Sequence, residues 1–371
     1  VYYFYVIIGL KKIYAFLYTT SISILAYPSV GTPFMDHHAV IFSLISIIFL
    51  ILSFLKNDKK YWFLSGVFII FSFFSKQIPS AYIGLIFIFI ILFYFFLSKK
   101  NARKNINYFI IGIISTSIFF LILFLANRIP LYNFFIQYIL YPMTIGSDRI
   151  TSFNFDLNNV FFQFKFIYLS LLPLALVFFI IIKKKLKNES NRKDFLVLSL
   201  LFLTFIVFIY SQLLTKNQIF IFFLIPFYLG ISHFYSSKYY KKTFVGVFIF
   251  FILLITTTKY HLTYNENKKF MDFVNADFKI ALNAEIIDER LRGLKWITPK
   301  YSNNPKHEIE LINQSVEIIL SDKKNKILVS NYQILSAVIK LKNYAPNKWF
   351  DPRSVPSKNN KYFVVYKEFF I

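Results

Sequence analysis

The sequence of 371 residues contains no cysteine, only nine glycines and few charged residues. The absence of cysteine fits any redox compartment, so it does not restrict where the protein resides. With so few glycines, the sequence offers no glycine-rich loop that could cradle a phosphate group, and it shows no internal repeat. Acidic residues are especially rare, because only six of the 18 precede residue 261. The ionisable groups in that part of the chain therefore need a specific explanation.

Hydrophobic residues, by contrast, make up 57% of the chain and aromatic residues 21%, with 50 phenylalanines. They occur in blocks of about twenty residues, the length that an α-helix needs to cross a bilayer. The sequence therefore predicts an all-α polytopic membrane protein with about ten transmembrane helices. The nine whole spans are expected at residues 13–30, 39–55, 61–75, 78–97, 107–126, 160–182, 195–214, 218–235 and 243–259. Residues 1–10 look like the end of another helix.

The net charge of +24 raises the question of nucleic-acid binding, and the distribution of the charge answers it. Eighteen basic residues fall in every second loop: Lys11, Lys12, Lys56, Lys59, Lys60, Lys99, Lys100, Arg103, Lys104, Lys183, Lys184, Lys185, Lys187, Arg192, Lys193, Lys238, Lys241 and Lys242. This alternation follows the positive-inside rule and predicts that these loops are cytoplasmic. Asp58, Glu189 and Asp194 lie among these cations, which they are expected to neutralise. The positive charge is thus explained without a nucleic-acid partner. The same alternation places Asp36 and the C-terminal residues on the outer face of the membrane.

Residues 261–371 have a different composition, with twelve of the 18 acidic residues and no apolar run long enough to span a membrane. We expect them to form a small extracytoplasmic soluble α/β domain after a transmembrane domain over residues 1–260. The spacing of apolar residues, and the flanking residues that interrupt regular structure, predict the helices and strands of this domain. They are helices at 275–297, 308–320 and 331–341, a buried strand at 326–330, and a strand or helix at 361–371.

The segment GTPFMDHHAVIF, residues 31–42, brings an aspartate and two histidines to the start of a predicted span. An aspartate there can simply cap the helix, because its carboxylate accepts hydrogen bonds from first-turn amides. Alternatively, Asp36 at the cap and His38 can turn toward one divalent ion, since carboxylate and imidazole suit Mn²⁺ or Zn²⁺. The other ligands would then have to come from Asp148, Asp156 or an upstream segment.

Three stretches of the chain resemble motifs of one superfamily of membrane enzymes. YPSVGTPFMDHHAVIFSLISIIF resembles an outer-loop motif in which an acidic residue heads a span. SGVFIIFSFFSKQIPSAYIGL resembles a glycine-to-proline stretch in which Gly66, Lys76 and a displaced Pro79 occupy the marked positions. FFIQYILYPMTIGSDRI is similar to a later outer loop that ends in an arginine, here Arg149. Through these motifs, residues 1–260 resemble the GT-C superfamily of polytopic glycosyltransferases, in its mannosyltransferase and aminoarabinose-transferase branches.

The resemblance implies transfer of a hexose or pentose from a polyprenyl-phosphate donor to an envelope glycan, lipid or protein at the outer face of the bacterial inner membrane. A cation near the departing phosphate lowers the barrier, and Lys76 and Arg149 are the candidates. Substrate-binding roles are expected for Asp36, His37, His38, Lys76 and Arg149. The expected metal ligands are Asp36 and His38, with a divalent metal ion as the cofactor. The catalytic base of the family lies in an earlier outer loop, so we expect it upstream of Val1, in an N-terminally truncated chain.

Other interpretations stay open. Lys76 can be an interfacial lysine, and Asp148 can simply neutralise Arg149. A lipid-linked glycan transporter or flippase would also need many spans, and Pro173 and Pro226 lie inside predicted ones, although the sequence shows no matching halves. A polysaccharide polymerase also acts on lipid-linked sugars but does not require the Asp-His motif. A non-catalytic scaffold would work through its soluble tail.

Overall fold

A computed structural model describes residues 1–26, 35–97, 102–145, 156–184, 186, 188–215, 221–240, 243–266, 276–324, 326–330, 334–340, 350 and 354–368. The chain divides into two compact units. The first comprises Val1–Ile139 and Gly146–Lys268, and the second comprises Leu140–Ile145 and Lys269–Ile371. The division at residue 260 into a transmembrane domain and an extracytoplasmic domain stays a prediction.

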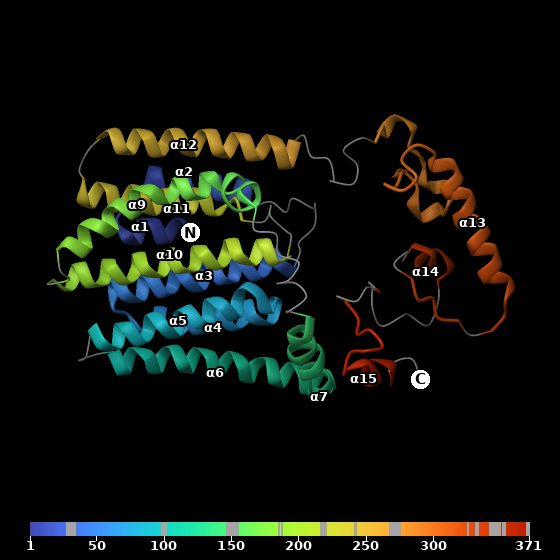
Figure 1. Ribbon diagram of the computed structural model, residues 1–371, viewed down its shortest axis with the longest axis horizontal. Coiled ribbons are helices and arrows are strands. Elements are labelled where there is room, and N and C mark those ends of the chain that lie inside the picture. The colour runs from blue at the N-terminus through green and yellow to red at the C-terminus, as the bar shows by residue number, and fades with distance from the viewer. Residues whose placement is uncertain are drawn as a thin grey trace. The chain divides into compact units, whose positions relative to one another are not determined.

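The long helices of the first unit lie side by side with their axes roughly aligned, whereas the short α7 runs across them (Figure 1). Its α-helices are α1 (Tyr2–Ile8), α2 (Lys12–Leu25), α3 (Met35–Lys56), α4 (Lys59–Ser75), α5 (Gln77–Leu97), α6 (Ala102–Ala126), α7 (Leu131–Phe135), α9 (Lys165–Lys183), α10 (Glu189–Thr215), α11 (Leu224–Tyr239) and α12 (Thr243–His261). Short π-helical turns are η1 (Ile136–Leu140), η2 (Asn158–Phe162) and η3 (Leu262–Glu266). Each of the nine predicted spans overlaps one of these helices.

Six helices in the described part of the chain are long and apolar enough to cross a membrane, namely α3, α5, α6, α9, α10 and the segment Phe244–Tyr264 that includes most of α12. The first unit therefore has the architecture of a helical integral membrane protein. Helices α4 and α11, with 17 and 16 residues, are shorter than these six. The predicted count of about ten spans stays a prediction.

The spans differ in how much of their surface is buried by neighbouring helices. In α3 and α10, 67% and 61% of the most apolar stretch is buried, whereas the value for α6 is 17%. Helix α6 therefore exposes large apolar side chains such as Ile114, Phe119 and Ile122. Such a surface is stable against lipid and unfavourable in water. Helices α3 and α10 thus form the interior, and α6 lies at the periphery.

Two glycines allow α4 and α6 to approach closely. A Cβ atom built on Gly66 would lie 2.2 Å from the carbonyl oxygen of Phe109, and one built on Gly112 would lie 2.2 Å from that of Phe63. Small residues at helix contacts are the usual means by which membrane helices gain van der Waals contact. Gly66, which occupies a motif position in the sequence, therefore has a packing role between these helices.

Several hydrogen bonds join the helix ends that carry basic residues. Asn105 Nδ2 at the start of α6 donates to Asn57 Oδ1 in the α3–α4 turn, at 2.7 Å. Arg192 Nη1 in the first turn of α10 donates to the carbonyl oxygen of Leu97 at the end of α5, at 3.0 Å. The ends for which the sequence predicts a cytoplasmic location are thus in direct contact.

Asp194 forms a polar cluster at the same helix ends. Its carboxylate is buried and accepts hydrogen bonds from Lys238 Nζ at 2.5 Å, Tyr239 Oη at 2.6 Å and Tyr235 Oη at 3.3 Å. A buried carboxylate with a cation and two hydroxyl donors is well compensated for its loss of hydration. The predicted neutralisation of Asp194 by a nearby lysine is confirmed, and the cluster ties α10 to α11.

The second unit differs from the sequence prediction at residues 275–297, where a helix was expected and is not formed. Instead the described residues 276–297 form 3₁₀ turns η5 (Phe278–Ile280), η6 (Ala284–Ile286) and η7 (Glu289–Leu291), and an antiparallel pair of strands. Strand β1 (Leu282–Asn283) pairs with β2 (Lys295–Trp296), with Leu282 opposite Trp296. Two aspartates explain the difference, because Asp277 and Asp288 each accept from the backbone amide two residues later and start a turn instead of an α-helix.

Helix α13 (Pro305–Ser321) confirms the predicted helix at 308–320. Asn304 caps it by accepting from the backbone amide of His307 at 3.2 Å, and Pro305 starts the first turn. Ile309 and Ile312 pack against Ile287 to form the small core of this unit. Within the described residues of this unit, the apolar core is small.

The remaining predictions for the second unit have mixed outcomes. Helix α14 (Ile334–Ile339) confirms part of the helix expected at 331–341, and α15 (Phe363–Lys367) shows that the last segment is helical rather than extended. The buried strand predicted at 326–330 is wrong, because Ile327 forms only an isolated bridge and Ile327 and Val329 are exposed. Alternation of apolar residues is too short there to define a buried face.

Candidate functional site

The structure joins two of the predicted site residues, Asp36 and Lys76, in an ion pair. Asp36 lies in the first turn of α3, and Lys76 is the C-terminal cap residue of α4. Lys76 Nζ donates to Asp36 Oδ1. The Asp36 side chain is 7% exposed and the Lys76 side chain 23% exposed, so the pair is largely buried yet reaches the protein surface through the lysine.

A break between α4 and α5 directs Lys76 toward α3. The backbone of Lys76 is extended, with φ −162° and ψ 141°, and its amide donates to the carbonyl oxygen of Ser72 at 3.0 Å. Ile78 is also non-helical, with φ −110° and ψ 129°, as expected for a residue that precedes a proline, here Pro79. The proline therefore separates the two helices and leaves Lys76 in an extended segment beside the start of α3.

Buried serines connect the helices beneath the ion pair. Ser72 Oγ donates to the carbonyl oxygen of Ala39 at 2.7 Å and also contacts Ser43 Oγ at 2.7 Å and Ser80 Oγ at 2.6 Å. Ser80 Oγ donates in turn to the carbonyl oxygen of Lys76 at 2.9 Å. These hydrogen bonds join α3, α4 and α5 and fix the backbone from which the Lys76 side chain extends.

Tyr138 forms hydrogen bonds with residues on both sides of Lys76, at the break between α4 and α5. Gln77 Nε2 donates to the Tyr138 carbonyl oxygen at 2.6 Å, and Tyr138 Oη donates to the carbonyl oxygen of Phe73 at 2.5 Å. Burial raises the pKa of Tyr138 to about 12, so the phenol stays neutral and remains a donor at physiological pH. The segment that carries Lys76 is thus anchored by serines on one side and by Tyr138 on the other.

The two histidines beside Asp36 have different environments. His37 is buried, with its ring edge-on to Phe223 at a centroid distance of 5.8 Å, whereas His38 is exposed. Because Asp36 is already helical, His38 lies about 200° around the helix axis from it. The expected arrangement, in which a non-helical Asp36 and His38 turn toward one ion, is therefore not observed.

Other predicted metal ligands are not brought together in the described residues. Within these residues, no group of three or more His, Cys, Asp or Glu side chains is close enough to hold a metal ion. Asp156 is exposed and accepts from the backbone amide of Asn158 at 3.2 Å, as a turn-capping residue does. Asp148 and Arg149 lie outside the described residues. The metal site at Asp36 and His38 stays a prediction without structural support.

Sequence reasoning missed the serine network, although the sequence contains a signal for it. Ser43, Ser46, Ser65, Ser72 and Ser80 recur inside otherwise apolar predicted spans. Hydroxyl groups in a membrane span need internal partners, so such a recurrence indicates contact between helices. The partners themselves could not be assigned without the structure.

Chemically, the Asp36–Lys76 pair presents an ammonium group whose position is fixed by a carboxylate and by the hydrogen-bonded backbone. An ammonium has three N–H donors, so Lys76 can donate to Asp36 and to a bound anion at once. Such a group suits the phosphate or carboxylate of a ligand at the membrane surface. No known protein family, characterised protein or solved structure matches this chain.

Proposed function

We propose that the first unit is the membrane domain of a GT-C-type glycosyltransferase, and that the Asp36–Lys76 pair contacts the phosphate of a polyprenyl-phosphate-linked sugar. The observation that carries the proposal is that two residues from two separate family-like motifs form one ion pair. The reaction is transfer of the sugar to a lipid, glycan or protein acceptor at the outer face of the membrane.

Within this proposal, Lys76 stabilises the negative charge that builds on the departing phosphate. An ammonium group whose position is already fixed needs little reorganisation in the transition state. The serines and Tyr138 fix the backbone segment that carries Lys76. Asp36 keeps the ammonium oriented and limits the net positive charge before the donor binds. No residue of this chain is assigned as the catalytic base.

The proposal also includes the topology predicted by the sequence. The chain would contain about ten spans, with its basic loops in the cytoplasm and the second unit outside, in a bacterial inner membrane. The ion pair lies where α3 begins and α4 ends, which is opposite to the α3–α4 turn with its basic residues. A donor with its sugar outside the cytoplasm would meet this end of the helices.

The deciding experiment measures sugar transfer by the native, full-length protein in proteoliposomes that contain a polyprenyl-phosphate sugar and an acceptor. Lys76→Met keeps the apolar stem and removes the charge, and it should reduce transfer by roughly ten-fold or more. Lys76→Arg should retain part of the activity because the charge survives. Lys165→Met is the matched control, since Lys165 is a lysine at the start of α9 that contacts the ring of Phe166.

The same preparation separates the proposal from its main rival. A flippase would move the lipid-linked sugar across the bilayer and release no glycosylated product. Translocation without transfer, or transfer by Lys76→Met at the rate of the unmodified protein, would overturn the assigned role of the ion pair.

A further inference from the structure

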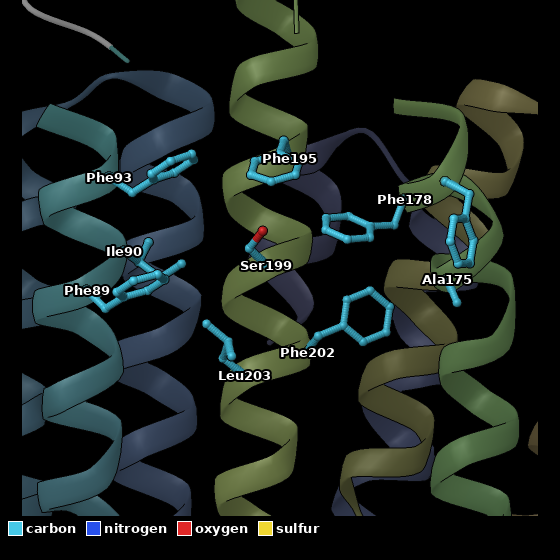
Figure 2. Close-up of a pocket in the computed structure, with 10 residues that line it drawn as sticks. Phe89, Ile90, Phe93, Ala175, Phe178, Phe195, Ser199, Phe202 and Leu203 are labelled. Atoms are coloured by element: carbon cyan, nitrogen blue, oxygen red, sulfur yellow. The ribbon is translucent and has the colours of Figure 1, made fainter. Parts of the chain in front are cut away.

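An apolar groove of about 440 Å³ lies on the surface of the first unit, between α5, α9 and α10. Figure 2 shows Phe89 and Phe93 on α5, Phe195 and Phe202 on α10, and Phe178 on α9 around it. Phe89 lies 13 residues beyond Lys76 on the chain, which is about 20 Å along a helix. The groove is therefore distinct from the Asp36–Lys76 site and lies toward the basic ends of the helices.

The walls of the groove are held by contacts between aromatic rings. Phe178 and Phe195 are stacked at a centroid distance of 5.1 Å, and Phe195 lies 5.8 Å from Phe93. Phe178 also contacts Phe202 at 5.6 Å. Because rings from all three helices interlock, contacts within the protein define the shape of the groove. Its volume lies in the range of about 300–1,000 Å³ that is typical of ligand sites.

The surroundings of the groove restrict what can fill it. Helices α5, α9 and α10 are all apolar enough to cross a membrane, and Phe89 at the groove is 60% exposed. The groove therefore opens onto the hydrocarbon of the bilayer, where lipid chains are the available ligands. A hydrocarbon chain brings no polar group that would be left without a partner against these phenylalanines.

The guanidinium group of Arg192 lies about one helical turn before Phe195, which lines the groove. Arg192, Phe195, Ser199 and Phe202 follow one another at intervals of three or four residues, so they share one face of α10. Arg192 Nη1 donates to the carbonyl oxygen of Leu97, at the end of the α5 face that carries Phe89 and Phe93. Its Nε atom is buried and has no hydrogen-bond partner among the described residues.

We propose that this groove binds one acyl chain of an anionic phospholipid, whose phosphate accepts hydrogen bonds from Arg192. The charge of the phosphate complements the guanidinium, which offers donors in a planar fork suited to phosphate. The acyl chain fills the space between the three helices and adds to the ring contacts and the Arg192–Leu97 hydrogen bond that already join them. The bound lipid therefore stabilises the contact of α5 and α9 with α10, whatever the reaction at the other end of the bundle.

The test compares phosphatidylglycerol with phosphatidylcholine of the same acyl chains, added to the purified full-length protein and followed by native mass spectrometry and thermal unfolding. Phosphatidylglycerol should bind roughly ten-fold more tightly and raise the unfolding temperature more, because its phosphate–guanidinium contact is not offset by a choline cation. Arg192→Gln should abolish this preference. Arg103→Gln is the matched control, because it removes the same charge from the exposed start of α6.

A second variant tests the groove itself. Ser199→Trp places a large side chain on the groove face of α10 and should lower the affinity for both lipids, while unfolding without added lipid shows whether the fold is intact. Equal binding of the two lipids, loss of the preference in Arg103→Gln as in Arg192→Gln, or unchanged lipid binding by a folded Ser199→Trp would each overturn the proposal.

Discussion

Lys76 donates to Asp36 across a separation of 40 residues, and this ion pair joins the end of α4 to the beginning of α3. In the sequence, the two residues belong to separate motifs with separate expected roles, one as a metal ligand and the other as a phosphate contact. In the structure, the two side chains form one ion pair. A largely buried charge that loses its partner is costly, so the effects of substituting the two residues cannot be independent.

A double-mutant cycle tests this dependence. Lys76→Met should lower the thermal stability of the purified protein because it removes a cation that contacts the buried Asp36 carboxylate. The double variant Asp36→Asn/Lys76→Met removes both charges and should recover most of the loss. The expected coupling free energy is about 0.5–3 kcal/mol, the range for residues in direct contact.

Activity measured on the same variants distinguishes stability from function. If Lys76 only neutralises Asp36, the double variant regains both stability and sugar transfer. If Lys76 also contacts the donor phosphate, the double variant regains stability alone, because no cation has been restored. Strictly additive effects of the two substitutions on stability would contradict the ion pair itself.

The glycines of α4 and α6 provide a second prediction. Gly66→Ala and Gly112→Ala each place a methyl group 2.2 Å from a backbone carbonyl oxygen, so the helices must separate. The expected cost is about 1–3 kcal/mol for each, the usual size of an overpacking effect. Gly84→Ala in α5 is the matched control, because a Cβ atom there has nothing within 4 Å. Thermal unfolding in detergent measures all three, and equal stability of the three variants would contradict the packing of α4 on α6.

The helices of the first unit were predictable because their signal is local. Each apolar block is bounded by basic residues or turn formers, and length alone then identifies a helix. The boundaries were less accurate. Helix α3 begins at Met35, so Asp36 is a first-turn residue of the helix and not the cap residue before it. With both residues helical, Asp36 and His38 lie about 200° apart around the helix axis.

The second unit and the ion pair were harder to predict, for two different reasons. The helix at 275–297 was predicted from the spacing of apolar residues, which takes no account of turn formers. Asp277 and Asp288 start turns, and Gly293 has a positive φ. Together these residues replace the helix by 3₁₀ turns and a pair of strands. The ion pair depends on a contact between distant segments, which no local pattern contains. The predicted spans at 61–75 and 78–97 place Lys76 between two helices, but they do not give the direction of its side chain.

Membrane topology gives a third prediction, which rests on the basic residues of alternate loops. A reporter enzyme fused after Lys187 should be active in the cytoplasm, and one fused after Lys300 should be active outside. Replacing basic residues near Lys56 with glutamine should weaken this orientation, because the bias depends on lysine and arginine in short loops. Finding both reporters on the same side would contradict the proposed arrangement of the spans.

The second unit allows a prediction about pH, which concerns Asp288 and Arg290. Arg290 Nε and Nη2 donate to the two carboxylate oxygens of Asp288 at 2.8 and 2.7 Å, and Nη2 also donates to the carbonyl oxygen of Ala337 in α14. These bonds, together with the backbone amide of Arg290, lower the pKa of Asp288 to about 2, from an ordinary value of 3.8. The contact between η7 and α14 therefore depends on an ionised carboxylate.

The sign of the effect follows from the lowered pKa. A carboxyl group whose folded pKa is depressed contributes stability that is present above its ordinary pKa of 3.8 and is lost as the pH falls through about 2. Protection of the α14 amides, measured relative to the intrinsic exchange rate at each pH, should consequently hold above pH 3.8 and fall progressively as the pH drops to about 2. In Arg290→Gln, the Asp288 titration, followed by ¹³C NMR of labelled aspartate, should move up toward 3.8. Arg292→Gln is the control, because Arg292 pairs with Glu285 and Glu289 and should leave the Asp288 midpoint in place. A midpoint that stays near 2 in Arg290→Gln would show that the guanidinium is not its cause.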